Sequence, residues 1–378
     1  MMTSRERAFA FFSHDSAIEV LRARGTAAPR WPSRARLLPS AGGCIHNQRG
    51  FRELALQEDL AALGISSQPA DLIVGKGQGR SFGKRARFHV WGSPIPPNSM
   101  LRASERLLVS GPELAVLQLA SFQLKAEPLI VQKLERFHAD KRELSYLGID
   151  ERPIIDHPLK WERFMRLVRI ATIAMELAGT YRLSPGELLP NYKAAPIMSM
   201  ASLMETAGFA EGFFGATRAQ RIAEMAADGS ASPMETSLFL MLTLPVEWGG
   251  YGLPRPVLNH TLDISQLRGS LASGDVITPD LLWGERLLAL EYESDAFHRK
   301  WHRPKLSTDA ERANTLSTLG YTVLRATPSE TLDLGRLTML ARQISVLLGR
   351  GVTEPDALGQ HRRRLLHAEL FPVSWRQE

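Results

Sequence analysis

Three acidic residues in two neighbouring apolar segments are the strongest chemical signal in this sequence. Asp280 lies in one predicted strand, and Glu291 and Glu293 end the next. Residues two apart in a strand point to the same face of the sheet, so the three carboxylates are predicted to converge. Converging carboxylates repel one another and lose hydration, and a hard cation such as Mg²⁺ offsets both costs. The spacing therefore predicts a site for Mg²⁺, with Mn²⁺ as a substitute.

Two alternatives accompany this interpretation. Carboxylates at this spacing also occur by chance. They would then lie at an exposed strand end and pair with arginines. A fourth carboxylate, Glu235, begins a predicted helix, where Ser232 can cap and Pro233 suits the first helical position. There Glu235 can return a hydrogen bond to the cap, which makes a capping box. Its other predicted role is to position metal or water beside the three carboxylates.

The segment after the carboxylates is basic. It contains His298, Arg299 and Lys300. A cationic loop beside an acidic metal site suits a phosphodiester, because arginine and lysine bind the neighbouring phosphates. The alternative is a solvated surface loop. Arg312, which follows in the next predicted helix, is expected to give structural support by pairing with Glu293 or Glu311.

The elements that must position these residues are predicted to form one domain of mixed α/β (α+β) class over residues 230–378. A mixed central sheet flanked by helices follows from the order helix, three strands, helix, strand, helix. The predicted segments are a helix over 233–242, strands near 257–264, 276–282 and 286–292, a helix over 309–319, a strand over 321–325 and a helix near 332–348.

Two further regions are predicted upstream. Residues 1–127 mix short helices, over 16–24 and 50–63, with strand-like stretches and turn-rich connectors, which is typical of a small α/β region. Residues 128–229 read as a helical connecting segment. Within it, apolar residues over 159–177 recur close to every 3.6 positions, which predicts an amphipathic helix with one basic flank.

Composition excludes several classes of protein. With 378 residues, 44% of them hydrophobic and 23% charged, the chain is neither disordered nor collagen-like. The single Cys44 cannot form an internal disulfide, which favours a reducing compartment. No apolar run approaches the roughly 20 residues needed to cross a bilayer, and the start lacks the apolar core of a signal peptide. We therefore expect a cytoplasmic protein without a membrane partner.

The net charge of +6 permits a nucleic-acid partner without demanding one. Its distribution is more informative, because the basic excess lies in residues 1–229 and the remainder is close to neutral. Four basic residues that follow a Gly-rich turn are predicted to contact a nucleic-acid backbone: Arg80, Lys84, Arg85 and Arg87.

The carboxylate region also carries a family resemblance. Pro279-Asp280 followed by Glu291-Tyr-Glu293 resembles the core of the PD-(D/E)xK nucleases. The longer string is similar to the branch around the very-short-patch-repair endonucleases: Glu291-Tyr-Glu-Ser-Asp-Ala-Phe-His298, Asp309-Ala-Glu-Arg312, Leu319-Gly-Tyr and Val323-Leu-Arg325. The match covers roughly residues 232–348. It departs from the family where Glu293 replaces the motif lysine and Ser294 replaces a glycine.

This resemblance implies a restriction-endonuclease-like fold that hydrolyses phosphodiester bonds with Mg²⁺. Asp280 and Glu291 would bind the metal, and Glu293 and Glu235 would position metal or water. Without the motif lysine, the proton transfer falls to a metal-activated water or to His298 as general base or acid.

The first region has a looser resemblance. Ser13-His-Asp-Ser-Ala-Ile-Glu-Val-Leu, the basic strand ending in His89-Val-Trp, and Leu108-Val-Ser-Gly-Pro-Glu-Leu-Ala are similar in order to AbiEi-type antitoxin-like proteins. In these proteins a small domain is often joined to a nuclease-like domain. No helix-turn-helix is readable before Ser13.

Together these patterns predict a metal-dependent nuclease acting on nucleic acid, with DNA favoured over RNA. The alternative is a noncatalytic DNA-binding regulator or antitoxin-like protein that keeps the nuclease fold as a scaffold. The sequence leaves open whether the chain binds a partner protein or forms a homodimer.

Overall fold

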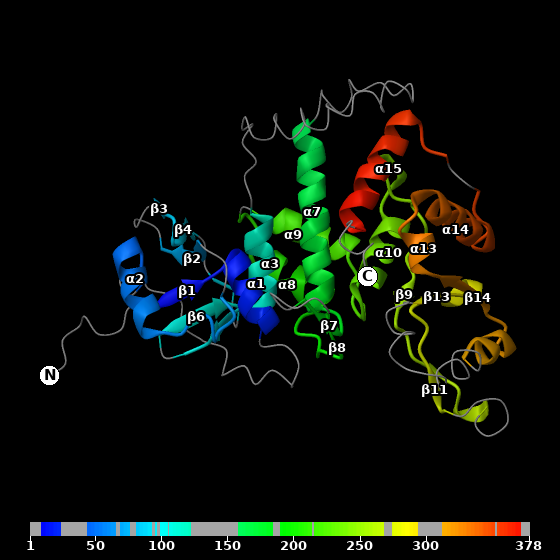
Figure 1. Cartoon of the computed structure of the whole chain (residues 1–378), viewed down its shortest axis with the longest axis horizontal. Coiled ribbons are helices and arrows are strands. Elements are labelled where there is room, and N and C mark those ends of the chain that lie inside the picture. Colours follow the sequence, from blue (N-terminus) through cyan, green and yellow to red (C-terminus); the bar gives the residue numbers. More distant parts are fainter. Residues whose placement is uncertain are drawn as a thin grey trace. The chain divides into compact units, whose positions relative to one another are not determined.

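The chain forms two compact units, one made of residues 1–123 and 169–228 and the other of residues 124–168 and 229–378 (Figure 1). Both are mixed α/β structures, as the sequence predicts. The computed structural model describes residues 9–23, 44–65, 69–75, 81–92, 95–96, 99–104, 106–121, 158–183, 190–213, 215–267, 274–293, 312–351 and 354–371.

The first unit is built on a six-stranded mixed sheet in the order β3-β4-β2-β1-β6-β5. The pairs β1·β6 and β2·β4 are parallel, and the other neighbours are antiparallel. Its central strands are apolar and buried on both faces, which suits strands covered by helices. The strands are β1 (Ala10–Phe12), β2 (Ala70–Val74), β3 (Ser81–Phe82), β4 (Ala86–Val90), β5 (Met100–Arg102) and β6 (Leu107–Ser110).

One fully buried helix organises the rest of the first unit. The apolar α3 (Pro112–Ala120) starts with proline at its first position and contacts α1, α8 and α9, so every one of its residues is buried. The other elements are α1 (His14–Ala23), α2 (Gln48–Gln57), α8 (Met200–Phe209), α9 (Ala216–Met225) and the hairpin of β7 (Tyr181–Arg182) and β8 (Asn191–Tyr192).

The long helix α7 (Pro158–Leu177) matches the predicted amphipathic helix. Its last carbonyls need donors, since they have no partner within the helix. The buried guanidinium of Arg182 donates to the carbonyl oxygens of Glu176 and Leu177, and the Glu176 carboxylate accepts from Arg22 at 2.6 Å. These arginines therefore stabilise the end of α7 by hydrogen bonding.

The second unit contains the four-stranded mixed sheet on which the carboxylates lie. Its order is β14-β13-β12-β9, with β13 and β14 parallel and the other neighbours antiparallel. The order of elements along the chain is the predicted one, with a helix over 312–318 between β13 and β14. The elements are α10 (Pro233–Thr243), β9 (Val257–Leu258), β12 (Leu281–Trp283), β13 (Leu288–Tyr292), β14 (Thr322–Ala326), α13 (Pro328–Thr331), α14 (Leu334–Leu347) and α15 (Ala357–Leu370).

Two of the predicted strands are each broken in two. The stretch 257–264 divides at Asn259, whose φ of 47° is left-handed, and the stretch 276–282 divides at Pro279, which has no N–H for a ladder. The separated halves form a second sheet, in which β10 (Leu262–Asp263) pairs with β11 (Val276–Ile277). The Asn259 N–H donates to the Asp280 carbonyl oxygen at 2.9 Å, so both breaks meet beside the predicted site.

A compact apolar cluster packs against one face of the four-stranded sheet. Leu282 and Ala289 lie on neighbouring strands and are in the same cluster as Leu316 of the helix over 312–318. Side chains alternate along a strand, so Glu291 extends from the same face as Ala289. Packing of Leu316 thus brings the start of its helix close to Glu291.

Two further expectations concern the environment of the chain. Within the described segments, no helix combines the length and apolar character that crossing a membrane requires. Cys44 is buried, and burial raises the pKa of its thiol to about 11, so the thiol stays protonated at neutral pH.

Candidate functional site

Asp280 and Glu291 face each other across two antiparallel strands. Leu281 pairs with Leu290 in the ladder between β12 and β13, so the preceding residue Asp280 lies opposite Glu291. The Asp280 carboxylate accepts the Tyr292 N–H at 2.7 Å, which ties it to the end of β13. Residues directly opposite each other share a face of the sheet, and two carboxylates placed in this way repel. The structure therefore brings together the two predicted metal ligands.

Glu235 approaches the same place from the start of α10. Ser232 caps this helix by accepting the Glu235 N–H at 3.1 Å, and Pro233 holds the first helical position, as predicted. The Glu235 carboxylate does not close the predicted capping box on Ser232. Its Oε2 accepts from the Ala231 N–H at 2.9 Å and from the Asn259 side-chain amide at 2.5 Å. The carboxylate is thus buried and oriented by groups outside the helix.

Negative charges lie close together among Asp280, Glu291 and Glu235, and this proximity affects the pKa values of Asp280 and Glu235. Burial, and then the charge of Glu235, raise the pKa of Asp280 to about 7, against the opposing effects of the Tyr292 N–H and Arg312. Burial also raises the pKa of Glu235, and the charge of Glu291 adds to this effect. The three carboxylates therefore interact through space, and the site gains a proton or a cation more readily than an isolated carboxylate.

One cation of the chain already lies against Glu291. Arg312 donates from one terminal nitrogen to both Glu291 carboxylate oxygens at 3.2 Å and to the Thr278 carbonyl oxygen at 2.9 Å. Of the two partners expected for Arg312, Glu293 pairs with Arg325 instead, and Glu311 lies outside the described residues. The packing of Leu316 places the start of the helix over Glu291. The supporting role expected for Arg312 is consistent with this geometry.

Glu293 does not join the other carboxylates. It follows the last residue of β13, and its carboxylate pairs with Arg325 of β14 at 3.0 Å. The parallel register places Arg325 beside Glu291, within reach of a side chain two residues further on. Glu293 thus adopts the alternative described above, a strand-end carboxylate paired with an arginine.

The donor set suits a hard cation in part. Asp280, Glu291 and Glu235 present oxygen ligands only, the type that Mg²⁺ prefers, and burial together with neighbouring negative charge raises the pKa of Asp280 and of Glu235. Among the described residues, however, no three His, Cys, Asp or Glu side chains are arranged closely enough to hold a metal ion. A cation at Asp280 and Glu291 would therefore have to compete with Arg312 for Glu291.

Replacing Asp280 with asparagine is expected to stabilise the metal-free protein by about 2 kcal/mol at pH 8, roughly half of what the full pKa shift implies at 1.36 kcal/mol per unit. The folded state holds this proton up to a pKa of about 7, whereas the ordinary value is 3.8. Wild-type stability therefore falls as pH rises from about 4 to 7, and the variant escapes this loss. Asparagine keeps an acceptor for the Tyr292 N–H.

Urea unfolding followed by tryptophan fluorescence at several pH values measures this difference, which should shrink toward pH 4. The exposed Glu285 provides a matched control, Glu285→Gln, with no expected gain. A gain for Asp280→Asn that is independent of pH would contradict the assignment.

Several predicted site residues lie outside the described residues. These are His298, Arg299 and Lys300 of the basic loop, and Arg80 of the first unit. Their roles stay predictions from the sequence.

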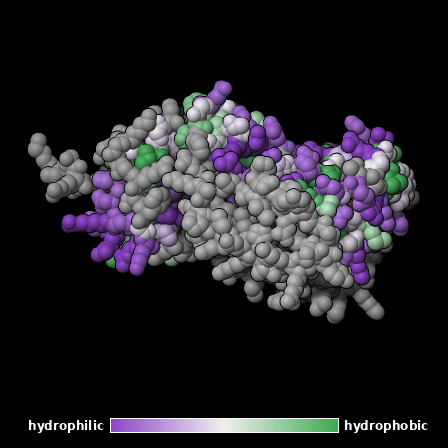
Figure 2. Space-filling view, turned by 90° about the horizontal axis from the view of Figure 1, so that it is seen from above, coloured by the Kyte–Doolittle hydropathy of each residue, from purple (hydrophilic) through white to green (hydrophobic). Residues whose placement is uncertain are grey.

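The described basic residues of the first unit are partly accessible. Lys84 and Arg85 are exposed in the turn between β3 and β4. Figure 2 shows hydrophilic side chains gathered at the left end, which carries α2, β3 and β4 in Figure 1. Arg87 is only 36% exposed and donates to Asp71 at 2.5 Å, so its guanidinium is already engaged within the unit.

A second polar cluster in the first unit was missed in the sequence. Asp71 is buried in β2 and accepts from Arg87 and from His89 Nε2, the latter at 2.7 Å. The His89 ring stacks on His14 at 4.0 Å between ring centres, and His14 has a left-handed φ of 47°. Burial alone raises the pKa of Asp71, but the hydrogen bonds and charges of His89 and Arg87 outweigh it and hold the pKa below its ordinary value. An acidic residue in an otherwise apolar strand was the available signal.

Asn259 was the other residue that sequence reasoning missed. Its amide donates to the Gly229 carbonyl oxygen and to Glu235, which links the chain before α10 to the break after β9. An asparagine between short strands signals a turn, but nothing in the sequence shows which carboxylate it contacts.

Comparisons with known proteins identified no relative of this chain. No model of a protein family, no curated protein and no solved structure matches the chain.

Proposed function

We propose that this protein is a metal-dependent nuclease that hydrolyses phosphodiester bonds of nucleic acid, with DNA favoured over RNA. The proposal is supported by the strand register that sets Asp280 opposite Glu291, together with the charge of Glu235 raising the pKa of Asp280 and the charge of Glu291 raising that of Glu235. Glu235 comes from a helix that is distant in sequence from the two neighbouring strands beside which Asp280 and Glu291 lie. A fold that brings carboxylates of like charge together at a partly buried place is under electrostatic cost, and such costs are concentrated at functional sites.

The fold of the second unit supports the same proposal. Its mixed sheet has three antiparallel strands and a parallel fourth strand. One helix precedes the first of these strands, and another lies between the third and the fourth. We infer that this is a restriction-endonuclease-like domain over residues 230–378. In it, the predicted ligands lie at one end of β12 and β13.

Asp280 and Glu291 would hold the Mg²⁺ ion, which Mn²⁺ could replace. When bound, the ion supplies a Lewis acid that polarises a phosphoryl oxygen and balances developing negative charge. Glu235, held by Ala231 and Asn259, would orient a water molecule by accepting its hydrogen bond.

The cationic residues would then hold the substrate. Arg312 is 43% exposed and contacts Glu291 through one terminal nitrogen, so its guanidinium can turn toward an incoming phosphate. His298 is proposed as general base or acid, and Arg299 and Lys300 would bind phosphates next to the scissile one. In the first unit, Lys84 and Arg85 offer exposed charge for the backbone of the same nucleic acid, with Arg87 and Arg80 beside them in sequence.

The experiment that tests the proposal is incubation of the full chain with single- and double-stranded DNA and RNA, with Mg²⁺, Mn²⁺ or EDTA. We expect cleavage of DNA with either metal and none with EDTA. Absence of cleavage of every substrate with both metals would overturn the proposal.

The second candidate is a noncatalytic DNA-binding regulator or antitoxin-like protein. The ion pair between Arg312 and Glu291 favours it, because a protein cation there already compensates one predicted ligand. DNA binding without cleavage, unchanged by EDTA, would support this candidate.

A further inference from the structure

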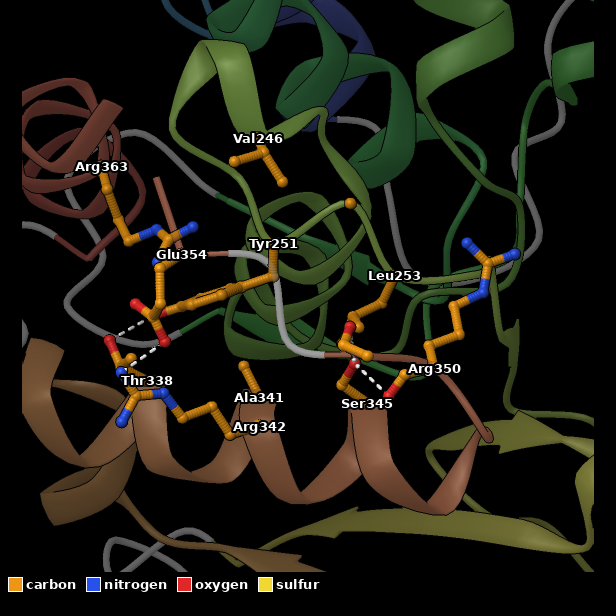
Figure 3. A pocket seen from close by; sticks show the side chains of 12 residues that line it. Val246, Tyr251, Leu253, Thr338, Ala341, Arg342, Ser345, Arg350, Glu354 and Arg363 are labelled. Carbon is orange, nitrogen blue, oxygen red and sulfur yellow. Dashed lines mark hydrogen bonds and ion pairs between the residues drawn. The ribbon is translucent and has the colours of Figure 1, made fainter. Parts of the chain in front are cut away.

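A pocket of about 510 Å³ lies in the second unit, away from the carboxylates (Figure 3). Its walls come from the turn after α10, from α14, from the segment after α14 and from α15. This volume is within the range of roughly 300–1,000 Å³ that is usual for small-molecule sites. No role described above involves it.

The turn that forms one wall is held in place by close backbone contacts. Gly249 has a φ of 94°, and a Cβ there would lie 2.6 Å from the backbone of Arg362 in α15. At Gly250 a Cβ would lie 1.9 Å from the Leu244 carbonyl oxygen. Only glycine allows this approach, which brings the carbonyl groups of the turn to α15.

A buried guanidinium belongs to the lining of the pocket. Arg363 is 6% exposed, and its Nε and one terminal nitrogen donate to the carbonyl oxygens of Gly249 and Gly250. Its carbon centre lies 4.2 Å from the centre of the Tyr251 ring, and Figure 3 shows the two side chains together. Within the part of the chain that the structure describes, Arg363 forms no ion pair with a carboxylate. Its guanidinium is oriented by two backbone carbonyl groups and an aromatic ring, and the charge of Glu354 in the same lining favours its positive charge.

The rest of the lining combines charged, apolar and hydroxyl side chains, and Figure 3 shows Arg350 on the opposite side of the pocket from Arg342. Arg342 and Glu354 form an ion pair at 2.6 Å, and Arg350 contributes a further positive charge, so the arginines outnumber the single acidic residue of the lining. The apolar part of the lining consists of Val246, Leu253 and Ala341. Hydroxyl groups of Thr338 and Ser345 complete it, with the Tyr251 hydroxyl bonded to Thr338 at 2.8 Å.

The pocket and the carboxylate site lie at opposite ends of α10. Glu235 is in the first turn of this helix, whereas the pocket turn bonds to its last turn, through the Tyr251 N–H to Met241 and the Leu253 N–H to Leu242. A rise of 1.5 Å per residue puts Glu235 about 10 Å along the helix from Met241 and Leu242. The two sites are therefore separate in space.

We propose that this pocket binds a small organic phosphate, such as a mononucleotide. The phosphate would be bound by the guanidinium groups of Arg363 and Arg342, whose planar donors match phosphate oxygens. The sugar and base would lie against Val246, Leu253 and Ala341. This inference goes beyond the nuclease proposal and does not depend on it, since neither Asp280 nor Glu291 takes part.

The test is isothermal titration calorimetry of the full chain in EDTA, with adenosine 5′-monophosphate, adenosine and benzoate as ligands. We expect the monophosphate to bind at least about tenfold more tightly than either of the others. If adenosine bound as tightly as the monophosphate, the pocket would not recognise the phosphate, which would overturn the proposal. If benzoate bound as tightly, the pocket would recognise carboxylates in general, which would also overturn it. No binding of the monophosphate at about 1 mM would overturn the proposal.

Variants locate the ligand. Arg342→Gln changes a side chain that is 48% exposed, so the fold should survive, and we expect at least about tenfold weaker binding. Arg336→Gln is the matched control on an exposed position of α14 outside the pocket, and should bind as wild type. Equal losses in both variants would indicate unspecific attraction and overturn the assignment.

Two more variants distinguish loss of binding from loss of folding, and distinguish the pocket from the nuclease site. Arg363→Lys keeps the charge but removes the planar donors, and is interpreted only if its unfolding midpoint matches wild type. Asp280→Asn should bind the monophosphate unchanged, whether or not the protein cleaves nucleic acid. Loss of binding in Asp280→Asn would place the ligand at the carboxylates and overturn the pocket proposal.

Discussion

Asp280→Asn is expected to lower metal-dependent cleavage by at least about 10³-fold, because several kcal/mol of stabilisation from the metal would be lost and each 1.36 kcal/mol is a factor of ten in rate. Asparagine retains the acceptor for the Tyr292 N–H, so the strand end should stay intact. Single-turnover cleavage of a labelled DNA duplex in Mg²⁺ and in Mn²⁺ measures the loss.

Two further variants make this result specific. Glu291→Gln should show a loss of similar size, since Glu291 lies opposite Asp280 and would share the ion. Glu285→Gln, at an exposed position between the same two strands, should cleave at the wild-type rate. Wild type and Asp280→Asn degrading DNA equally would show that the cleavage comes from a contaminant.

His298→Ala is the second large expected effect, a loss of about 10²–10⁴-fold in cleavage rate, the usual contribution of a positioned acid or base. The motif lysine is replaced by Glu293, so His298 is the next residue in sequence able to exchange a proton near neutral pH. Rates measured from pH 5 to 9 should lose an ionisation near the imidazole pKa of about 6.5 in the variant.

A separate readout distinguishes proton transfer from metal binding. The rise in unfolding temperature on addition of Mn²⁺ should be the same for His298→Ala and wild type, because the carboxylates are the proposed ligands. His302→Ala, in the same basic loop, is the matched control and should cleave normally. A wild-type cleavage rate for His298→Ala would show that the imidazole takes no part in catalysis. Loss of the Mn²⁺-induced rise in unfolding temperature would show that the imidazole is a metal ligand.

The order of elements could be predicted from the sequence because it depends on local periodicity. Strands and helices of the second unit, such as β13, β14 and α14, appear within a few residues of their predicted positions. The predicted strands failed at Asn259 and Pro279, where one residue turns the chain and the other lacks a ladder donor. Both breaks are single-residue effects inside segments that are otherwise apolar, so periodicity conceals them.

The carboxylate pair was also within reach of sequence reasoning. Asp280 and Glu291 end adjacent antiparallel strands joined by a tight connection, and the register follows from that connection. Glu235 could be connected to them only by resemblance, because its position depends on how α10 packs and on Asn259. The carboxylate partners of Arg312 and Arg325 could not be predicted from the sequence, since several carboxylates lie at suitable spacing.

By itself, then, the sequence determined the mixed α/β class, the order of elements and the identity of two facing carboxylates, because each depends on neighbours along the chain. Only the tertiary structure decided that Arg312 pairs with Glu291, that Glu293 pairs with Arg325, and that Arg363 is buried in the lining of a pocket. The physical reason is that burial and charge pairing depend on distances through space between segments that are far apart in sequence. A side chain's type sets what it can bind, and packing selects which partner it meets.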